Sequence, residues 1–258
     1  MISPLASVDP QAKIGNNVTI SPFAFIESDV VIGDDTWIGP NAVIMNGARI
    51  GKKCKIFPGA VISAIPQDLK YEGELTTTEI GDNTTIRECV TLNRGTKDRW
   101  KTSIGTNCLL MAYVHIAHDC EVGNNVILAN SVNVAGHVVI EDWVILEGYV
   151  GVSQFVHIGA HAFVAGQCGV RKNVPPFVKA AREPLAYVGV NSVGLRRRGF
   201  TNEAILQVED IYRTLYVKGL NVTNAVDVIE KEASESKEKN HILDFIRNSK
   251  DGIIRGIS

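Results

Sequence analysis

The sequence lacks several features that would assign it to a class at once. Its 26 Lys and Arg residues nearly balance its 28 Asp and Glu residues, so the net charge of −2 gives no prediction of nucleic-acid binding. No N-terminal signal peptide is visible, and no apolar run is long enough to span a bilayer. The five cysteines include no CxxC pair. We therefore expect a soluble, cytoplasmic protein with packed free thiols and without disulfides, nucleic-acid partners or membrane insertion.

What the sequence has instead is a six-residue repeat. Every sixth residue from Ile2 to Val170 gives 29 positions, of which 26 are aliphatic; the exceptions are Asp68, Glu74 and Asp98. A period of six fits neither a helix nor a simple alternating strand, but it fits a solenoid with one short strand and one corner per hexad. Three hexads make a triangular coil, so residue i lies beneath residue i+18 at about 4.8 Å. Gly and Asn suit the corners, where a positive φ is cheap for them.

Two segments interrupt the aliphatic series, and the six-residue spacing resumes in register after each of them. Residues 65–78 cannot form a buried coil and are predicted to loop outward, and residues 97–102 form a second, shorter excursion. Long loops ejected from a rigid solenoid are more often functional than decorative.

Beyond residues 173–176 the pattern becomes helical. We expect a first helix between Thr201 as its cap and Gly219 as its stop, and further helices at about 224–233 and 241–248, with the polar stretch 232–239 as an exposed turn. The predicted domains are a parallel β-helix over residues 1–175 and a connector with a small α-helical domain over residues 176–258. The helices would cover the unpaired edge of the last coil.

The stretch from His115 to Cys120 contains the best candidates for chemistry. A histidine titrates near neutral pH and can take a proton from a hydroxyl group, and His118 is our candidate for that base. Stacking by 18 places His118, Gly136 and Gln154 in one outward column. A glycine above the base leaves open space and an approachable backbone N–H, as an oxyanion hole requires. By the same rule Asp119 lies beneath His137 and can orient nearby imidazoles.

Several motifs resemble those of the UDP-N-acetylglucosamine O-acyltransferase family of hexapeptide-repeat enzymes. The His-Ile-Ala-His-Asp-Cys and Gln-Asp-Leu-Lys-Tyr stretches are much more selective than the hexads, and the likeness covers essentially the whole chain. It implies left-handed coils, which periodicity alone cannot give. The matching stretches are 67–71, 94–96, 115–120, 135–137, 154–155, 159–161 and 197–200.

The resemblance also implies an activity. The donor would be a (3R)-3-hydroxyacyl thioester on acyl carrier protein, and the acceptor would be the glucosamine 3-hydroxyl of UDP-N-acetylglucosamine, in the first step of lipid A biosynthesis. His118 would remove the hydroxyl proton for a direct attack on the thioester, without an acyl-enzyme, a cofactor or a metal. The active sites would lie between the subunits of a homotrimer, and basic residues near the C-terminal end would suit the acidic carrier.

The same resemblance assigns further roles residue by residue. Asp119 would orient and polarise His118, and the Gly136 N–H would hold the oxyanion. Asp68 and Lys70, on the long excursion, would contact the sugar and acyl groups, and Gly166 would form the floor of the acyl groove. The remaining expected pocket residues, for sugar, phosphate and nucleotide, are His115, His137, Gln154, Asn191, Arg197 and Arg198.

The chain departs from the family pattern at three positions. Asn93 and Ser153 stand where the family commonly has histidine, and Val193 replaces an acidic residue expected near the nucleotide. These departures concern nucleotide contacts and leave His118 and Gly136 untouched.

Other interpretations stay open from the sequence. One is a different hexapeptide acyltransferase, such as the N-acyltransferase two steps later in the same pathway, which has an extra N-terminal domain; here the hexads begin at Ile2. Another is a zinc hydratase of the carbonic-anhydrase type, with His115 and His118 among three histidine ligands, which metal analysis would test. A third is a non-enzymatic scaffold, which the ejected loop and the histidine cluster disfavour.

Overall fold

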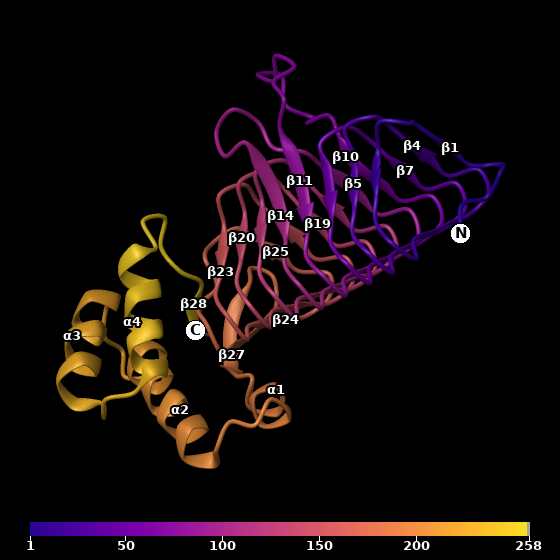
Figure 1. The fold of residues 1–258 in the computed structure, drawn as a ribbon. Coiled ribbons are helices and arrows are strands. Elements are labelled where there is room, and N and C mark those ends of the chain that lie inside the picture. The colour runs from indigo at the N-terminus through magenta and orange to yellow at the C-terminus, as the bar shows by residue number, and fades with distance from the viewer. Residues whose placement is uncertain (257–258) are drawn as a thin grey trace.

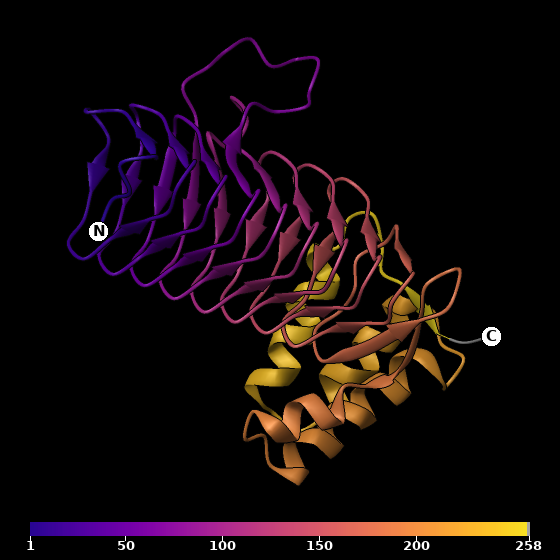
Figure 2. The ribbon, with the colours of Figure 1, turned by 90° about the vertical axis from the view of Figure 1, so that its right-hand side faces the viewer.

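The structure is a computed structural model that describes residues 1–256. It is a left-handed parallel β-helix with a helical C-terminal region packed at one end, as the sequence predicts (Figure 1). The N-terminus lies at the far end of the coils, and the long excursion projects from their side in both ribbon views (Figures 1 and 2).

Three sheets form the faces of the coils. The first contains β1 (Ser7–Val8), β4 (Phe25–Ile26), β7 (Val43–Ile44), β10 (Val61–Ala64), β13 (Thr91–Asn93), β16 (His115–Ile116), β19 (Asn133–Val134), β22 (Gly151–Val152) and β25 (Gly169–Val170). The second contains β2 (Lys13–Ile14), β5 (Val31–Ile32), β8 (Ala48–Ile50), β11 (Thr77–Ile80), β14 (Lys101–Ile104), β17 (Glu121–Val122), β20 (Val139–Ile140) and β23 (His157–Ile158). The third contains β3 (Thr19–Ile20), β6 (Trp37–Ile38), β9 (Lys55–Ile56), β12 (Thr85–Ile86), β15 (Leu109–Leu110), β18 (Ile127–Leu128), β21 (Ile145–Leu146), β24 (Phe163–Val164), β26 (Val178–Ala181), β27 (Ala186–Val190) and β28 (Arg255–Gly256).

The strand register confirms the spacing of 18. His115 pairs with Asn133, which pairs with Gly151. The spacing rises to 30 between Val61 and Thr91 and to 24 between Ile80 and Ile104, since the two excursions add 12 and 6 residues. Each excursion ends two residues before the predicted limit, because β11 and β14 extend at their N-terminal ends to pair with each other.

The inward aliphatic residues of the repeat fill a continuous core, and most are less than 5% exposed. Burial of this kind is the main favourable term in folding. Many glycines that follow them are required by close approach of the coils rather than by positive φ. A Cβ on Gly105, for example, would clash with the carbonyl oxygen of Gly123.

Asn residues, including Asn17, Asn83 and Asn125, adopt left-handed backbone at the corners, as expected. Left-handed backbone also occurs at aromatic and histidine residues, including Phe155 (φ 64°) and His137 (φ 62°). Such residues adopt this conformation at a cost, which contacts along the stack can offset. The rings of His137 and Phe155 lie 4.7 Å apart and nearly parallel.

The C-terminal region contains elements that the sequence did not predict. An antiparallel hairpin of β26 and β27 continues the third sheet past its last coil, and β28 adds to its edge. The helices are α1 (Ser192–Arg197), α2 (Asn202–Tyr216), α3 (Val222–Glu232) and α4 (Lys237–Asn248). Thr201 caps α2, as predicted, by accepting a hydrogen bond from the Ala204 N–H. Helix α1 was not predicted.

The expected exposed turn at 232–239 was wrong in part, because α4 starts at Lys237 and Lys239 is only 2% exposed. Its ammonium group donates to the carbonyls of Glu230 and Ala233 and to the carboxylate of Glu235. A buried cation is tolerated when it is paired and hydrogen-bonded in this way. No helix among residues 1–256 has the length and apolar character needed to cross a membrane.

A histidine–glutamate cluster joins α4 to the β-helix. Glu141, next to β20, lies 2.7 Å from Nε2 of His157 and accepts hydrogen bonds from Nε2 of His241 and the N–H of Ala160. Burial by itself would raise the pKa of Glu141, but these bonds outweigh it and hold the pKa at about 2. The hydrogen bond to Glu141 raises the pKa of His241 above its ordinary 6.5.

We therefore expect this cluster to stabilise the protein most between about pH 4.5 and 6.5. The contribution of Glu141 is lost as pH falls from 4.5 towards 2, and that of His241 is lost as pH rises through its raised pKa. Thermal unfolding of wild type and Glu141→Gln across pH should show the widest gap in this window. Glu79 and Lys101 form an exposed ion pair, and such pairs contribute little to stability. Glu79→Gln therefore serves as the control and should show no such optimum. A gap independent of pH would contradict the prediction.

Candidate active site

His118 and Asp119 form a buried pair at the corner between β16 and β17. Nδ1 of His118 lies 2.8 Å from Oδ2 of Asp119, and the two residues are 5% and 0% exposed. Burial by itself would raise the pKa of Asp119, but hydrogen bonds from His118, Thr96 and Arg99 outweigh it, so the pKa lies below its ordinary value. An ionised carboxylate carries no proton, so Nδ1–H donates and Nε2 keeps its lone pair. The pair is thus arranged as a base with Nε2 available to a substrate.

Gly136 lies directly above His118, as the spacing of 18 predicts. A Cβ at position 136 would be 2.7 Å from Cε1 and 2.8 Å from Nε2 of His118, so only glycine fits over the ring in this position. Within residues 1–256 the Gly136 N–H donates no hydrogen bond, which leaves it available to an oxyanion. Gln154, the third member of the column, is exposed.

The long excursion brings Asp68 to this pair but leaves Lys70 outside. Oδ2 of Asp68 lies 4.0 Å from Nε2 of His118, the nitrogen proposed to face the substrate. The Lys70 N–H donates to Oδ1 of Asp68, which shapes the turn, while the Lys70 side chain is exposed. His118 therefore points away from the solenoid core, as expected, yet it is covered rather than exposed.

His137 lies edge-on to His118, with ring centroids 5.0 Å apart. Its Nε2 is 4.0 Å from Oδ2 of Asp119, as the stacking predicts, and its Nδ1 is 3.1 Å from Oδ2 of Asp98. The sequence reasoning missed Asp98, although one signal was present: Asp98 interrupts the aliphatic column of the repeat. It also missed Thr96 and Arg99, which both bond to Asp119.

His115 lies on β16, but its ring contacts Thr91 and not the His118–Asp119 pair. Its Nδ1 lies 2.7 Å from the hydroxyl of Thr91, and burial lowers its pKa, so it stays neutral near pH 7. Within residues 1–256 the possible metal-binding group consists of His118, Asp119 and His137, with ligand atoms within 4.8 Å, rather than His115 with His118. Asp119 already accepts four hydrogen bonds, so a metal would have to displace at least one of them. The donor set does not match the three histidines of the hydratase interpretation.

The other expected binding residues gather near the C-terminal end of the coils. Asn191 caps α1 and donates to the carbonyl of His161, and Arg198 lies 3.3 Å from Nδ1 of His161 and over the ring of Trp143. Burial, reinforced by the nearby Arg198 charge, lowers the pKa of His161 to about 4, so it remains neutral. Arg197 is exposed. No hydrogen bond or ion pair within residues 1–256 joins this group to His118.

Gly166 occupies a different corner from His118, as predicted. A Cβ at Gly166 would meet the carbonyl oxygen of Gly148 at 3.1 Å, and one at Gly148 would meet that of Asn130 at 3.4 Å. The Gly166 N–H donates to the carboxylate of Glu147. The three residues therefore stack as the spacing of 18 requires.

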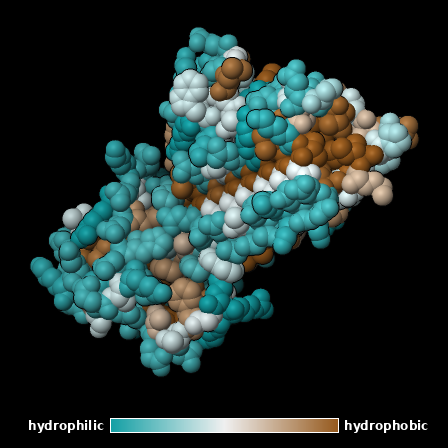
Figure 3. Space-filling view, viewed as in Figure 1, coloured by the Kyte–Doolittle hydropathy of each residue, from teal (hydrophilic) through white to brown (hydrophobic). Residues whose placement is uncertain are grey.

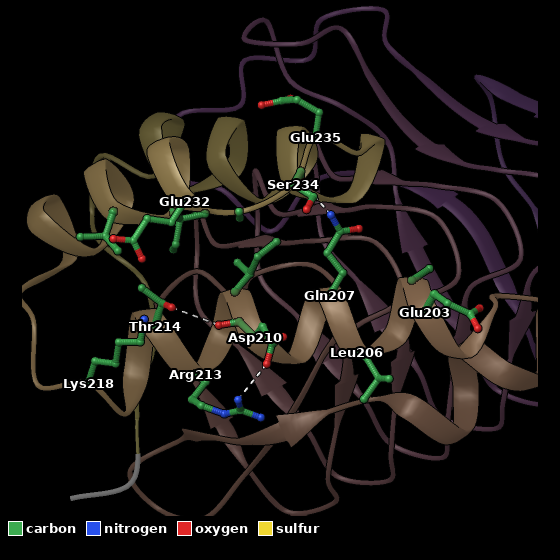
Figure 4. A pocket seen from close by; sticks show the side chains of 15 residues that line it. Glu203, Leu206, Gln207, Asp210, Arg213, Thr214, Lys218, Glu232, Ser234 and Glu235 are labelled. Carbon is green, nitrogen blue, oxygen red and sulfur yellow. Dashed lines mark hydrogen bonds and ion pairs between the residues drawn. The ribbon is translucent and has the colours of Figure 1, made fainter.

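A hollow of about 890 Å³ lies elsewhere, between α2 and α3 (Figure 4). Two polar contacts lie within its lining: Arg213 pairs with Asp210 at 2.8 Å, and Gln207 donates to the carbonyl of Ser234. The hollow contains none of the predicted site residues, so we do not assign the chemistry to it.

Comparison with known proteins agrees with the geometry. A family model described as bacterial transferase hexapeptide (six repeats) matches residues 29–64 and 101–136, and one described as UDP N-acetylglucosamine O-acyltransferase, domain 2, matches residues 173–257. A curated acyl-[acyl-carrier-protein]–UDP-N-acetylglucosamine O-acyltransferase from Janthinobacterium sp. (strain Marseille) is 46% identical over 260 residues, covering 99% of each chain.

Solved structures lead to the same assignment. The UDP-N-acetylglucosamine acyltransferase of Bacteroides fragilis 9343 superimposes with a TM-score of 0.97 at 51% identity, over 99% of this chain and 100% of that one. The Francisella novicida UDP-N-acetylglucosamine acyltransferase gives 0.96 at 42% identity, over 99% and 94%. From the repeat, the His118–Asp119–Gly136 corner and these matches together, the chain belongs to the UDP-N-acetylglucosamine O-acyltransferase family.

Proposed function

We propose that the protein transfers a (3R)-3-hydroxyacyl group from acyl carrier protein to the glucosamine 3-hydroxyl of UDP-N-acetylglucosamine. The observation that carries the proposal is the buried His118–Asp119 pair directly beneath Gly136. The names of the relatives specify acyl carrier protein and UDP-N-acetylglucosamine. The motif resemblance places the reaction at the first step of lipid A biosynthesis. The free cysteines suit a reducing compartment, the cytoplasm.

In the proposed mechanism, Nε2 of His118 removes the proton of the sugar hydroxyl while the oxygen attacks the thioester carbonyl. The Gly136 N–H donates to the oxyanion that forms. The carbon–sulfur bond then breaks, and the carrier thiol leaves with the proton that His118 returns. The cysteines are not needed as nucleophiles: burial raises the pKa of the nearby Cys120 to about 12, so its thiolate is scarce.

The binding roles are assigned from the motif resemblance, and the position of Asp68 supports one of them. Asp68 approaches the base and is assigned to the sugar, with Lys70 on the same excursion available to the acyl group. His115 and His137 flank the corner of His118 and are assigned to the sugar and phosphate pocket. The nucleotide is assigned to Gln154, Asn191, Arg197 and Arg198, with arginine suited to diphosphate.

We infer a homotrimer with shared sites from the separation of these groups. The convex corner of His118 offers little concavity by itself, and Asn191 and Arg198 lie beside His161, near the C-terminal end of the coils. Figure 3 shows apolar surface over the coils of β1, β4 and β7, where Leu5, Phe23 and Phe25 are exposed. Exposed apolar patches mark interaction sites, and these coils are available to bind a second copy.

The decisive experiment is an acyl-transfer assay with UDP-N-acetylglucosamine and a panel of 3-hydroxyacyl carrier proteins. We expect a 3-O-acylated sugar nucleotide, and none from the 3-deoxy analogue, which keeps every other contact. Light scattering on the same sample should give the mass of three chains. Absence of ester product with every donor would contradict the proposed function, and full activity from a monomer would contradict the shared site.

We predict that Gly166 sets the accepted acyl length. With glycine there the groove stays open, so wild type should prefer long 3-hydroxyacyl donors over ten-carbon ones. Gly166→Met should move the preference towards shorter donors, because one methylene in an apolar pocket is worth about 1–3 kcal/mol. The affinity for the nucleotide should stay unchanged, because only the acyl groove is filled. Competition assays with mixed donors measure this directly. Equal loss on all donors, or an unchanged long-chain preference, would show that Gly166 only turns the corner.

A further inference from the structure

The short excursion between β13 and β14 contacts Asp119 more extensively than His118 does. The N–H and the hydroxyl of Thr96 donate to Oδ1 and Oδ2 of Asp119 at 2.9 and 2.7 Å, and the N–H of Arg99 donates to Oδ1 at 3.1 Å. Nδ1 of His118 supplies the fourth bond, to Oδ2 at 2.8 Å. A carboxylate offers about four lone-pair sites, so three of the four on Asp119 are taken by this excursion.

The backbone of Asp119 is held as well. Its N–H donates to the Thr102 hydroxyl on β14 at 2.9 Å, and its carbonyl accepts from the Arg99 guanidinium at 3.1 Å. Arg99 is anchored in turn by its ion pair with Glu121. Asp119 therefore has a fully buried carboxylate, a left-handed backbone (φ 59°) and no freedom to rotate away from His118.

The coil does not need these residues to turn. The next coil passes from β16 to β17 with four residues, 117–120, whereas the passage from β13 to β14 uses seven, 94–100. The added residues break the aliphatic repeat and place polar groups at the corner of His118. The inserted residues interrupt the aliphatic repeat, and their polar groups contact one buried carboxylate. A role in the active site therefore explains the insertion better than a role in folding the coil.

We propose that Thr96 and Arg99 are positioning residues, which fix the Asp119 carboxylate and limit the negative charge that it offers to His118. The effect on catalysis rests on the proposed acyl transfer, whereas the hydrogen bonds of Thr96 and Arg99 to Asp119 do not depend on it. Each donor on Oδ2 competes with His118 for the same oxygen. Without the Thr96 hydroxyl, Oδ2 would keep one hydrogen bond, from Nδ1 of His118, and the charged form of the imidazole would be favoured.

Other charged or titratable groups face the pair, and Thr96→Val touches one of them, because the Asp98 N–H donates to the Thr96 hydroxyl at 3.2 Å. His137 lies edge-on to His118, with its Nε2 4.0 Å from Oδ2 of Asp119. Asp68 approaches Nε2 of His118 from the long excursion, and Asp98 faces His137 from the short one. The Arg99–Glu121 pair lies on the side of β17. The Cys120 thiol remains protonated.

The test replaces Thr96 by valine, which removes the hydroxyl and keeps the backbone bond. We expect kcat to fall on the order of 10-fold, with KM for UDP-N-acetylglucosamine within about two-fold of wild type. The acid limb of the kcat/KM profile should move up by about half a pH unit or more, the equivalent of one hydrogen bond. Thr96→Ser, which restores the hydroxyl, should restore both.

Thr84→Val is the matched control. Thr84 is also buried, and its hydroxyl donates to the Gly105 carbonyl and accepts from the Cys108 N–H, so valine removes both bonds. Valine already occupies its stacked column at Val18, Val126 and Val144. Its pH profile should match wild type. A Thr96→Val profile that coincides with the Thr84→Val profile would overturn the proposal.

A second measurement separates this proposal from the proposed function. The titration of the His118 ring nitrogens, followed by ¹⁵N NMR in the free protein, should move to higher pH in Thr96→Val and not in Thr84→Val. This readout needs no substrate. A wild-type protein without acyl transfer would refute the function, whereas an unmoved titration would refute the positioning role.

Discussion

Replacing His118 by alanine should lower kcat by on the order of 100-fold or more, because the variant loses the general base that takes the hydroxyl proton. Nε2 is the ring nitrogen left with a lone pair, since Nδ1 donates to Asp119. The measurement is steady-state turnover with a 3-hydroxyacyl carrier protein and UDP-N-acetylglucosamine.

Stability must be measured beside activity in this variant. His118 is 5% exposed, so truncation leaves Asp119 without one of its four donors, which costs about 1–3 kcal/mol in a buried site. Light scattering and thermal unfolding should still show a folded protein. His157→Ala, which removes a histidine of the α4 cluster, serves as the control and should keep near-normal turnover. Near-normal turnover of His118→Ala itself would refute the assignment of the base.

Gly136→Ala should also reduce kcat on the order of 100-fold while leaving the oxyanion N–H in place. The new Cβ would lie 2.7 Å from Cε1 of His118, a distance that real Cβ atoms do not tolerate, so the imidazole must move. A small displacement of a catalytic group can cost this much. Turnover and a structure of the variant would measure the loss and the ring shift together.

Gly151→Ala is the matched control for this prediction, because a Cβ there meets nothing within 4 Å. It should change turnover little. If Gly136→Ala keeps wild-type activity with His118 displaced, the ring position seen here is not the reactive one. If the ring does not move, the steric argument for glycine fails.

Much of this protein could be predicted from the sequence because its repeat has a constant length. Once the period of six implies a coil of 18 residues, backbone pairing places His118 under Gly136 and Asp119 under His137, with no knowledge of side chains. The same arithmetic places Gly166 over Gly148. The capped helix α2 was predictable for a similar local reason, a side-chain bond between Thr201 and a backbone N–H three residues on.

Only the tertiary structure decided what the non-periodic segments do. Nothing in the local sequence places Thr96 and Arg99 on the carboxylate of Asp119, 20 or more residues away, or brings Asp68 within 4.0 Å of His118. The hairpin of β26 and β27 and the buried Lys239 were missed for the same reason. A repeat transmits its geometry from one coil to the next through identical hydrogen bonds, so its positions follow from counting. A loop has no such repeated bond, and its path is determined by whichever distant groups satisfy its polar atoms.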